Sequence, residues 1–140
     1  MGTQVSPSDL HTLQLTSSLA SMNTLENFID RLRNQYELNE EIYANVLTCL
    51  NEACVNAILH GNKENEALKV YINLEVLDGK KLVFTVTDEG AGFDVETVPD
   101  PTTEDNREKP AGRGVYIIRK LADQCIFNNK GNQIELHFKI

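Results

Sequence analysis

LKVYINLEVLDGKKLVFTVTD, residues 68–88, is the stretch that decides the fold. Its apolar residues alternate with polar ones, as they do in strands that bury one face and leave the other in water. The alternation is interrupted at Asp78-Gly79, a dipeptide that accepts the positive φ angles of a two-residue hairpin turn. The stretch therefore predicts two antiparallel strands joined by a tight turn.

Amphipathic helices are expected both before and after this hairpin in the sequence. Apolar residues recur at three- and four-residue steps over residues 25–36, 39–60 and 114–123. Gly61 is well placed to end the second of these helices. Shorter alternating patterns predict a first strand at residues 11–16 and a closing hairpin over residues 125–140.

These elements predict an α+β fold. We expect residues 1–140 to form a single domain, a two-layer α/β sandwich with about three helices on one face of a mostly antiparallel mixed sheet of about five strands. Residues 94–111 stand apart, because they carry three prolines and no periodicity. A loop of that length in a compact domain usually has a function or is disordered.

Composition narrows the function classes. The 140 residues carry 13 Lys and Arg against 21 Asp and Glu, a formal charge of −8 that argues against binding nucleic acid or anionic membranes through bulk electrostatics. The three cysteines show no metal-binding spacing, and we expect a reducing, cytoplasmic compartment. The N-terminal residues do not show the pattern of a signal peptide, and no apolar run approaches the ~20 residues of a membrane span. We therefore expect neither feature.

The second helix carries a polar stripe. Glu52 and Asn56 are four residues apart and so lie on one helix face. A carboxylate and a carboxamide at this spacing can serve as a general base and a Mg²⁺ ligand, since Mg²⁺ prefers hard oxygen donors. The alternative is an ordinary solvent-exposed face.

Asp88-Glu89-Gly90-Ala91-Gly92-Phe93 follows the second strand of the hairpin. By the two-residue period of that strand, Asp88 points into the core. A carboxylate there needs hydrogen-bond donors, which a ligand amino group could supply, and the glycines allow close approach. The alternative is that Asp88 only begins a turn.

Gly112-Arg113-Gly114 is expected to open the third helix. The free N–H groups of a helix N-terminus favour anions, and Arg113 could add a charged fork. Taken alone, this pattern is more often a flexible turn than a phosphate site.

In this order, the three motifs resemble the nucleotide-binding (Bergerat) fold of the GHKL superfamily, which includes gyrase and histidine kinases. Residues 52–62, EACVNAILHGN, resemble its asparagine box, residues 88–93 the first glycine box and residues 112–114 the second. The Asn-Ala-Ile-Leu-His-Gly ending and the short length are most similar to the anti-sigma factor serine/threonine-protein kinase branch.

The resemblance implies a role for each matching position. Glu52 would be the general base, Asn56 the Mg²⁺ ligand and Asp88 the acceptor for the adenine amino group. Residues 94–111 would be the ATP lid. The remaining implied ATP-binding residues are His60, Asn62, Gly90, Gly92, Phe93, Gly112, Arg113 and Gly114. For His60, a structural role at the helix end is the alternative.

The resemblance also implies an activity. We expect an ATP- and Mg²⁺-dependent kinase that phosphorylates a STAS-type anti-anti-sigma antagonist, with a sigma factor as a second candidate partner. The alternative is a nucleotide-gated switch of the same fold that binds a partner without phosphoryl transfer. Pairing of two copies stays open.

Overall fold

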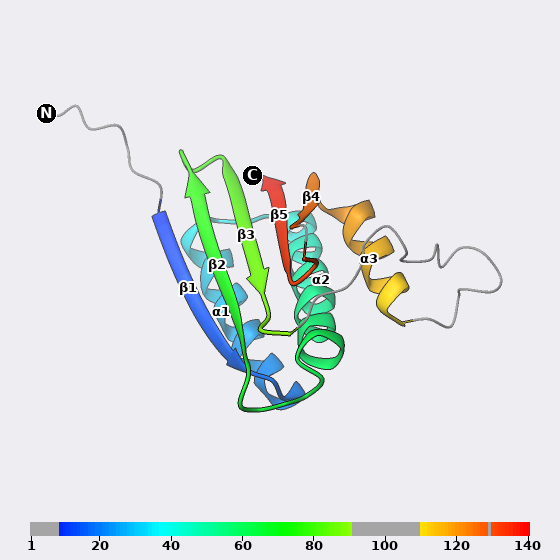
Figure 1. The fold of residues 1–140 in the computed structure, drawn as a ribbon. Coiled ribbons are helices and arrows are strands. Elements are labelled where there is room, and N and C mark those ends of the chain that lie inside the picture. The colour runs from blue at the N-terminus through cyan, green and yellow to red at the C-terminus, as the bar shows by residue number, and fades with distance from the viewer. Residues whose placement is uncertain (1–8, 91–109, 129) are drawn as a thin grey trace, which may run out of the picture.

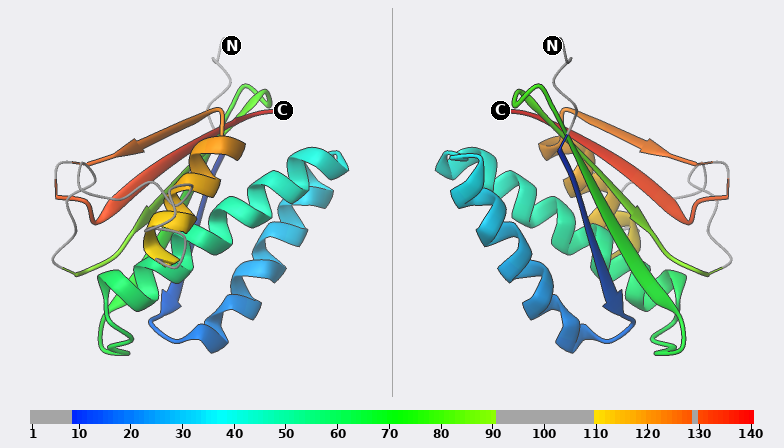
Figure 2. Two further views of the ribbon diagram at one scale, coloured as in Figure 1. Left: turned by 90° about the vertical axis from the view of Figure 1, so that its right-hand side faces the viewer. Right: turned by 90° about the vertical axis from the view of Figure 1, so that its left-hand side faces the viewer.

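The computed structural model describes residues 9–90, 110–128 and 130–140, which form two layers. Figure 1 shows the sheet and Figure 2 shows the helices stacked on one side of it. The strands are β1 (Asp9–Thr16), β2 (Lys69–Leu77), β3 (Lys81–Thr87), β4 (Gln124–Phe127) and β5 (Gln133–Lys139). The helical elements are η1 (Leu19–Ser21), α1 (Met22–Gln35), α2 (Glu40–Asn56), η2 (Ala57–Gly61) and α3 (Pro110–Leu121). The predicted architecture of three main helices on a five-stranded sheet is confirmed.

The strands of the sheet run in the order β1-β2-β3-β5-β4, and all four pairings are antiparallel, so the described sheet is antiparallel rather than mixed as predicted. The predicted hairpin is present as β2 and β3, with Asp78 and Gly79 at φ +52° and +66°. Its connection differs from the expected two residues, because Leu77 pairs with Lys81 and the N–H of Lys80 donates to the carbonyl of Leu77. Three residues therefore separate the strands.

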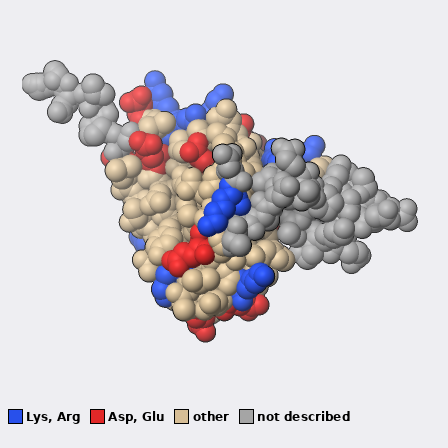
Figure 3. Space-filling model, viewed as in Figure 1, with Lys and Arg blue, Asp and Glu red and all other residues tan. Residues whose placement is uncertain are grey.

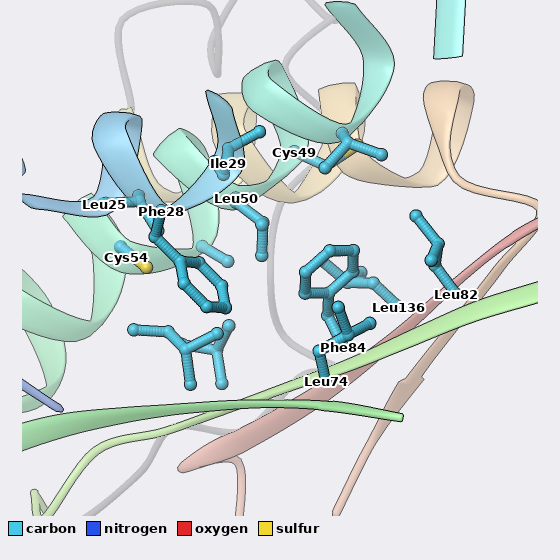
Figure 4. Packing of buried hydrophobic residues seen from close by; sticks show 14 of the residues in the cluster. Leu25, Phe28, Ile29, Cys49, Leu50, Cys54, Leu74, Leu82, Phe84 and Leu136 are labelled. Atoms are coloured by element: carbon cyan, nitrogen blue, oxygen red, sulfur yellow. The ribbon is translucent and has the colours of Figure 1, made fainter. Parts of the chain in front are cut away.

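The core lies between the sheet and the helices (Figure 4). Every second residue of β2 and β3 is buried, as the alternation predicted. From the other layer, α1 contributes Leu25, Phe28, Ile29 and Leu32, and α2 contributes Val46, Cys49, Leu50, Ala53 and Cys54. Asn39 caps α2 by accepting the N–H of Ile42 at 2.8 Å, which fixes where this central helix begins.

The opposite face of the sheet carries no helix among the described residues (Figure 2). Figure 3 shows charged side chains scattered over the otherwise uncharged surface on that side. Leu10 and Ile126 are exposed there by 74% and 49%. One continuous helical run, Glu40–Gly61, has the length and mean hydropathy, 1.3, of a membrane span, contrary to the expectation from the sequence. Core helices of globular proteins pass the same test, and this run supplies Leu50 and Ile58 to the core.

Two helix ends differ from the prediction, and both differences bear on the site. The helical run that starts with α2 changes after Asn56 into the π-turn η2, where the N–H of Asn62 donates to the carbonyl of Ala57. Helix α3 begins at Pro110, so residues 110 and 111 of the predicted lid belong to this helix. Proline is favoured at a first helical position, where its missing N–H costs nothing. Residues 94–109 of the predicted lid lie outside the described residues.

Candidate functional site

A pocket opens between α2, α3 and the ends of β3 and β5. It holds about 420 Å³ of space free of protein atoms, a volume that includes open solvent at its mouth. Its walls are mostly apolar, and its polar lining includes Asp88 and Asn56. The lining residues are Ala53, Asn56, Ala57, Gly61, Val86, Asp88, Val115, Ile118, Phe127, Gly131, Asn132, Gln133 and Ile134.

Asp88 lines the pocket because it continues the inward row of β3. Its exposure is 8%, and its Oδ1 atom accepts the N–H of Gly90 at 2.8 Å. Burial raises the pKa of the Asp88 carboxyl above its ordinary value, although the N–H of Gly90 and the charge of Lys130 act in the opposite direction. A buried carboxylate with acceptor capacity left over is suited to a ligand that donates a hydrogen bond.

Two glycines make room for this carboxylate. A Cβ atom on Gly61 would overlap the carboxyl group of Asp88, with Oδ1 only 2.8 Å away. A Cβ atom on Gly90 would overlap the backbone carbonyl of Gly61. The sequence predicted Gly61 as a helix end, and the structure shows that close packing against Asp88 also requires glycine there.

Asn62 lies beneath this end of the pocket. It is 1% exposed, and its Nδ2 atom donates to Ser17 Oγ at 2.8 Å and to the carbonyl of Lys69 at 3.0 Å. Its Oδ1 atom accepts the N–H of Glu89 at 2.9 Å. Asn62 therefore connects three segments of the chain, which supports a role in holding the loop after Asp88 rather than a direct contact with a ligand.

Glu52 and Asn56 approach α3 at Gly114, and of these three residues Asn56 lines the pocket. We call this region the Gly114 end of the pocket. A Cβ atom on Gly114 would lie 2.9 Å from both Glu52 Oε2 and Asn56 Nδ2. The missing side chain at Gly114 thus lets α3 approach the polar stripe of α2 closely. Among the described residues, neither the Glu52 side chain nor the Asn56 side chain has a hydrogen-bond partner, so both polar groups are available to a ligand.

The other predicted site residues are less close or lie outside the description. His60 is exposed and does not line the pocket. This position agrees with the alternative of a structural role at the helix end. Gly112 lies in the first turn of α3, where helix geometry leaves backbone N–H groups without intrahelical partners and so favours an anion. The side chain of Arg113 falls outside the described part, as do Gly92 and Phe93.

The turn between β4 and β5 was not predicted as part of the site. Gly131, Asn132 and Gln133 line the pocket, and Gly131 has φ +78°. Asn132 Nδ2 donates to the carbonyl of Asp88 at 3.0 Å, and the carbonyl of Asn132 accepts the N–H of Asp88 at 2.9 Å. Three asparagines and a glycine within residues 128–132 signalled a turn, but nothing in the sequence placed that turn beside Asp88.

The sequence matches a family of known domains over most of its length. The model of the histidine kinase-like ATPase domain matches residues 15–138. The chain belongs to this family. Its matched span contains both ends of the pocket and all three motifs.

Individual relatives are similar over parts of the chain. An anti-sigma F factor of Heyndrickxia coagulans is 38% identical over 79 residues, which cover 54% of this chain and 53% of the relative. The chain thus spans about half the length of that protein. A serine-protein kinase RsbW of Oceanobacillus iheyensis is 26% identical over 113 residues, 76% of this chain and 68% of the relative. A histidine kinase domain from Erythrobacter litoralis superposes with a TM-score of 0.49 at 16% identity, covering 85% of this chain and 59% of that one.

Proposed function

We propose that this protein is an ATP- and Mg²⁺-dependent serine/threonine-protein kinase that acts in the cytoplasm on a STAS-type anti-anti-sigma antagonist. One observation carries the proposal: Glu52 and Asn56 converge on Gly114, and Asn56 lines the same pocket as the buried carboxylate of Asp88. The names of the relatives, a serine-protein kinase and anti-sigma F factors, support this choice within the family.

The Asp88 end is suited to an adenine base. Apolar side chains such as Val86, Val115 and Ile118 would cover the faces of the ring, and the Asp88 carboxylate would accept a hydrogen bond from the 6-amino group. Because the carboxylate is buried, a base that presents an oxygen at that position would leave it without this donor.

The Gly114 end is suited to phosphates and to the acceptor hydroxyl. The free N–H groups of the first turn of α3 would hold phosphate oxygens. The Glu52 carboxylate would accept the proton of the serine or threonine hydroxyl as it attacks the terminal phosphorus. Catalysis would rest mainly on positioning these groups.

The donor set fits Mg²⁺. The side chains of Asn56 and Glu52 carry hard oxygen donors on one helix face, and Mg²⁺ usually takes only one or two protein ligands beside water and phosphate. No group of three or more His, Cys, Asp or Glu side chains that could hold a metal occurs among the described residues, which is compatible with that mode. Bound there by Asn56, Mg²⁺ would neutralise charge on the phosphates.

A second candidate is a nucleotide-gated switch that sequesters a sigma factor without transferring phosphate. The similarity to proteins named anti-sigma F factor favours it, since that name describes binding rather than catalysis. The two candidates share the ATP site and differ in whether Glu52 acts as a base.

Transfer of labelled phosphate tests the proposal. The protein is incubated with γ-labelled ATP, Mg²⁺ and a purified STAS-domain protein from the same genome, and phosphorylation of that protein is expected. Glu52→Gln should bind ATP with little change and lose transfer by about 10²- to 10⁴-fold, the usual contribution of a general base. Glu66→Gln, at an exposed carboxylate outside the pocket, is the matched control and should transfer normally.

Each other outcome has its own meaning. Undiminished transfer by Glu52→Gln would remove the assigned base. ATP binding without transfer, together with ATP-dependent capture of a purified sigma factor, would favour the switch. No binding of ATP at millimolar Mg²⁺ would contradict both candidates.

A further inference from the structure

The turn between β4 and β5 holds the backbone of Asp88 from the sheet side. Asp88 and Asn132 exchange two hydrogen bonds: the N–H of Asp88 donates to the carbonyl of Asn132 at 2.9 Å, and Asn132 Nδ2 donates to the carbonyl of Asp88 at 3.0 Å. The residues are 44 positions apart in sequence. The second of these bonds depends on the side chain of Asn132, so it can be removed by substitution.

Asn128 holds the side chain of Asn132 in turn. Asn128 Oδ1 accepts the N–H groups of Gly131, Asn132 and Gln133 at 2.8, 3.1 and 3.3 Å. Because this oxygen faces three donors, the amide orientation of Asn128 is fixed by its surroundings. Its Nδ2 atom then donates to Asn132 Oδ1 at 2.8 Å, which leaves Asn132 Nδ2 to face the carbonyl of Asp88.

On the opposite side, Asn62 holds the next peptide. Its Oδ1 atom accepts the N–H of Glu89 at 2.9 Å, and the carboxyl of Asp88 packs on Gly61. The strand end at Asp88 is therefore held between two asparagines. On the Asn132 side, one of the two hydrogen bonds to the Asp88 backbone comes from a side chain, and Asn132 lines the pocket.

We propose that Asn132 is a positioning residue for base recognition, which acts through Asp88 rather than by contacting the base. Asn128 and Asn132 form an amide relay that aims the Asp88 carboxylate at the amino group of the bound purine. The relay sets how strongly the pocket prefers a 6-amino purine over a 6-oxo purine. This inference rests on the proposed binding of ATP.

The test compares ATP with ITP, inosine triphosphate, whose 6-position carries an oxygen in place of the amino group. Dissociation constants of both nucleotides are measured by calorimetry for the wild type, Asn132→Ala, Asn132→Asp and Asp88→Asn. The wild type should prefer ATP by about 10- to 100-fold, the range for one hydrogen bond to a charged group. Both Asn132 variants should reduce this preference at least about threefold, mainly by weakening ATP.

A ratio of two affinities is the useful readout, because a partly unfolded variant lowers both affinities equally. Asn132→Asp keeps the size of the side chain and removes the donor, so it separates the hydrogen bond from packing. Asn128→Ala should change the ratio in the same direction and by less. Asn73→Ala, an exposed amide on the open face of the sheet, should leave the ratio unchanged.

A double substitution tests whether Asn132 acts through Asp88. When the carboxylate has been removed in Asp88→Asn, adding Asn132→Ala should change the ATP to ITP ratio no further. An unchanged ATP to ITP ratio in both Asn132 variants would overturn the inference. A further change of this ratio when Asn132→Ala is added to Asp88→Asn would overturn it as well, because Asn132 would then act independently of the carboxylate. A wild type that binds neither nucleotide would instead contradict the proposed function.

Discussion

The Asp88 end of the pocket is held by hydrogen bonds on both sides, whereas the Gly114 end is not. Around Asp88, the N–H groups of Asp88, Glu89 and Gly90 and the carbonyl of Asp88 all have partners. The side chains of Glu52 and Asn56 approach α3 but have no hydrogen-bond partner in the described part of the chain. One end is rigid before a ligand arrives, and the other has polar groups that a ligand must satisfy.

The difference fits the two tasks in the proposed reaction. Recognition of a base requires a fixed acceptor, because a carboxylate that could turn away would not discriminate between bases. The transfer of phosphate requires groups that are free to engage a metal, phosphates and a protein hydroxyl. The same substitution, glycine to alanine, should therefore have different effects at the two ends.

Gly61→Ala should have the largest effect on folding and binding. The new Cβ atom would meet the carboxyl of Asp88, which cannot move aside while its backbone is held by Asn62 and Asn132. We expect a loss of about 1–3 kcal/mol in the free energy of unfolding, the usual cost of overpacking, and a clear loss of ATP affinity. Urea denaturation and calorimetry would measure both.

A second substitution shows whether the carboxyl is the obstacle. Adding Asp88→Ala to Gly61→Ala removes the group that the Cβ atom meets, so the pair should be less destabilised than the sum of the two single changes. Additive losses would mean that the damage lies in η2 itself.

Gly114→Ala should leave folding intact and slow transfer. The Cβ atom would meet only the ends of two flexible side chains, at 2.9 Å from each. Because alanine is the better helix former, the free energy of unfolding should stay level or rise by up to about 1 kcal/mol. Displacement of Glu52 and Asn56 should slow transfer to the STAS-domain protein by about 10- to 100-fold.

The preference for ATP over ITP is the internal control for Gly114→Ala. It depends on the Asp88 end and should match that of the wild type. A marked loss of stability in this variant would show that the Gly114 end is as tightly built as the Asp88 end, and the comparison between the ends would fail.

The sequence could predict those features of the two ends of the pocket that depend on local periodicity, and it missed those that depend on contacts between distant segments. The inward direction of Asp88 came from the two-residue period of β3, and the shared face of Glu52 and Asn56 from the four-residue step of α2, both of which are local. The π-turn at Ala57–Gly61 and the start of α3 at Pro110 did not follow from apolar periodicity. Asn132 could not be found, because its partner lies 44 residues away and turn composition does not identify a partner.

The buried state of Asp88 gives the smallest predicted effect, a pH-dependent difference between wild type and Asp88→Asn. Burial raises the pKa of this carboxyl in the folded chain above its ordinary value of 3.8, so the folded chain keeps a proton that the unfolded chain has already lost. The contribution of Asp88 to stability therefore falls as pH rises from below 3.8 through the raised folded value. Asparagine carries no such charge and can still accept the N–H of Gly90.

Relative to wild type, Asp88→Asn should gain stability as pH rises through that interval and keep a constant advantage at higher pH. The difference between the free energies of unfolding of the two proteins is taken at each pH from urea denaturation. The contribution of the other carboxylates cancels in this difference, because they titrate in both proteins. Bound ATP should weaken the trend, because its amino group favours the ionised carboxylate and so lowers the pKa of Asp88. A difference that does not change with pH would mean that the carboxyl at the rigid end is not destabilised by its burial, and that holding it in place costs the fold nothing.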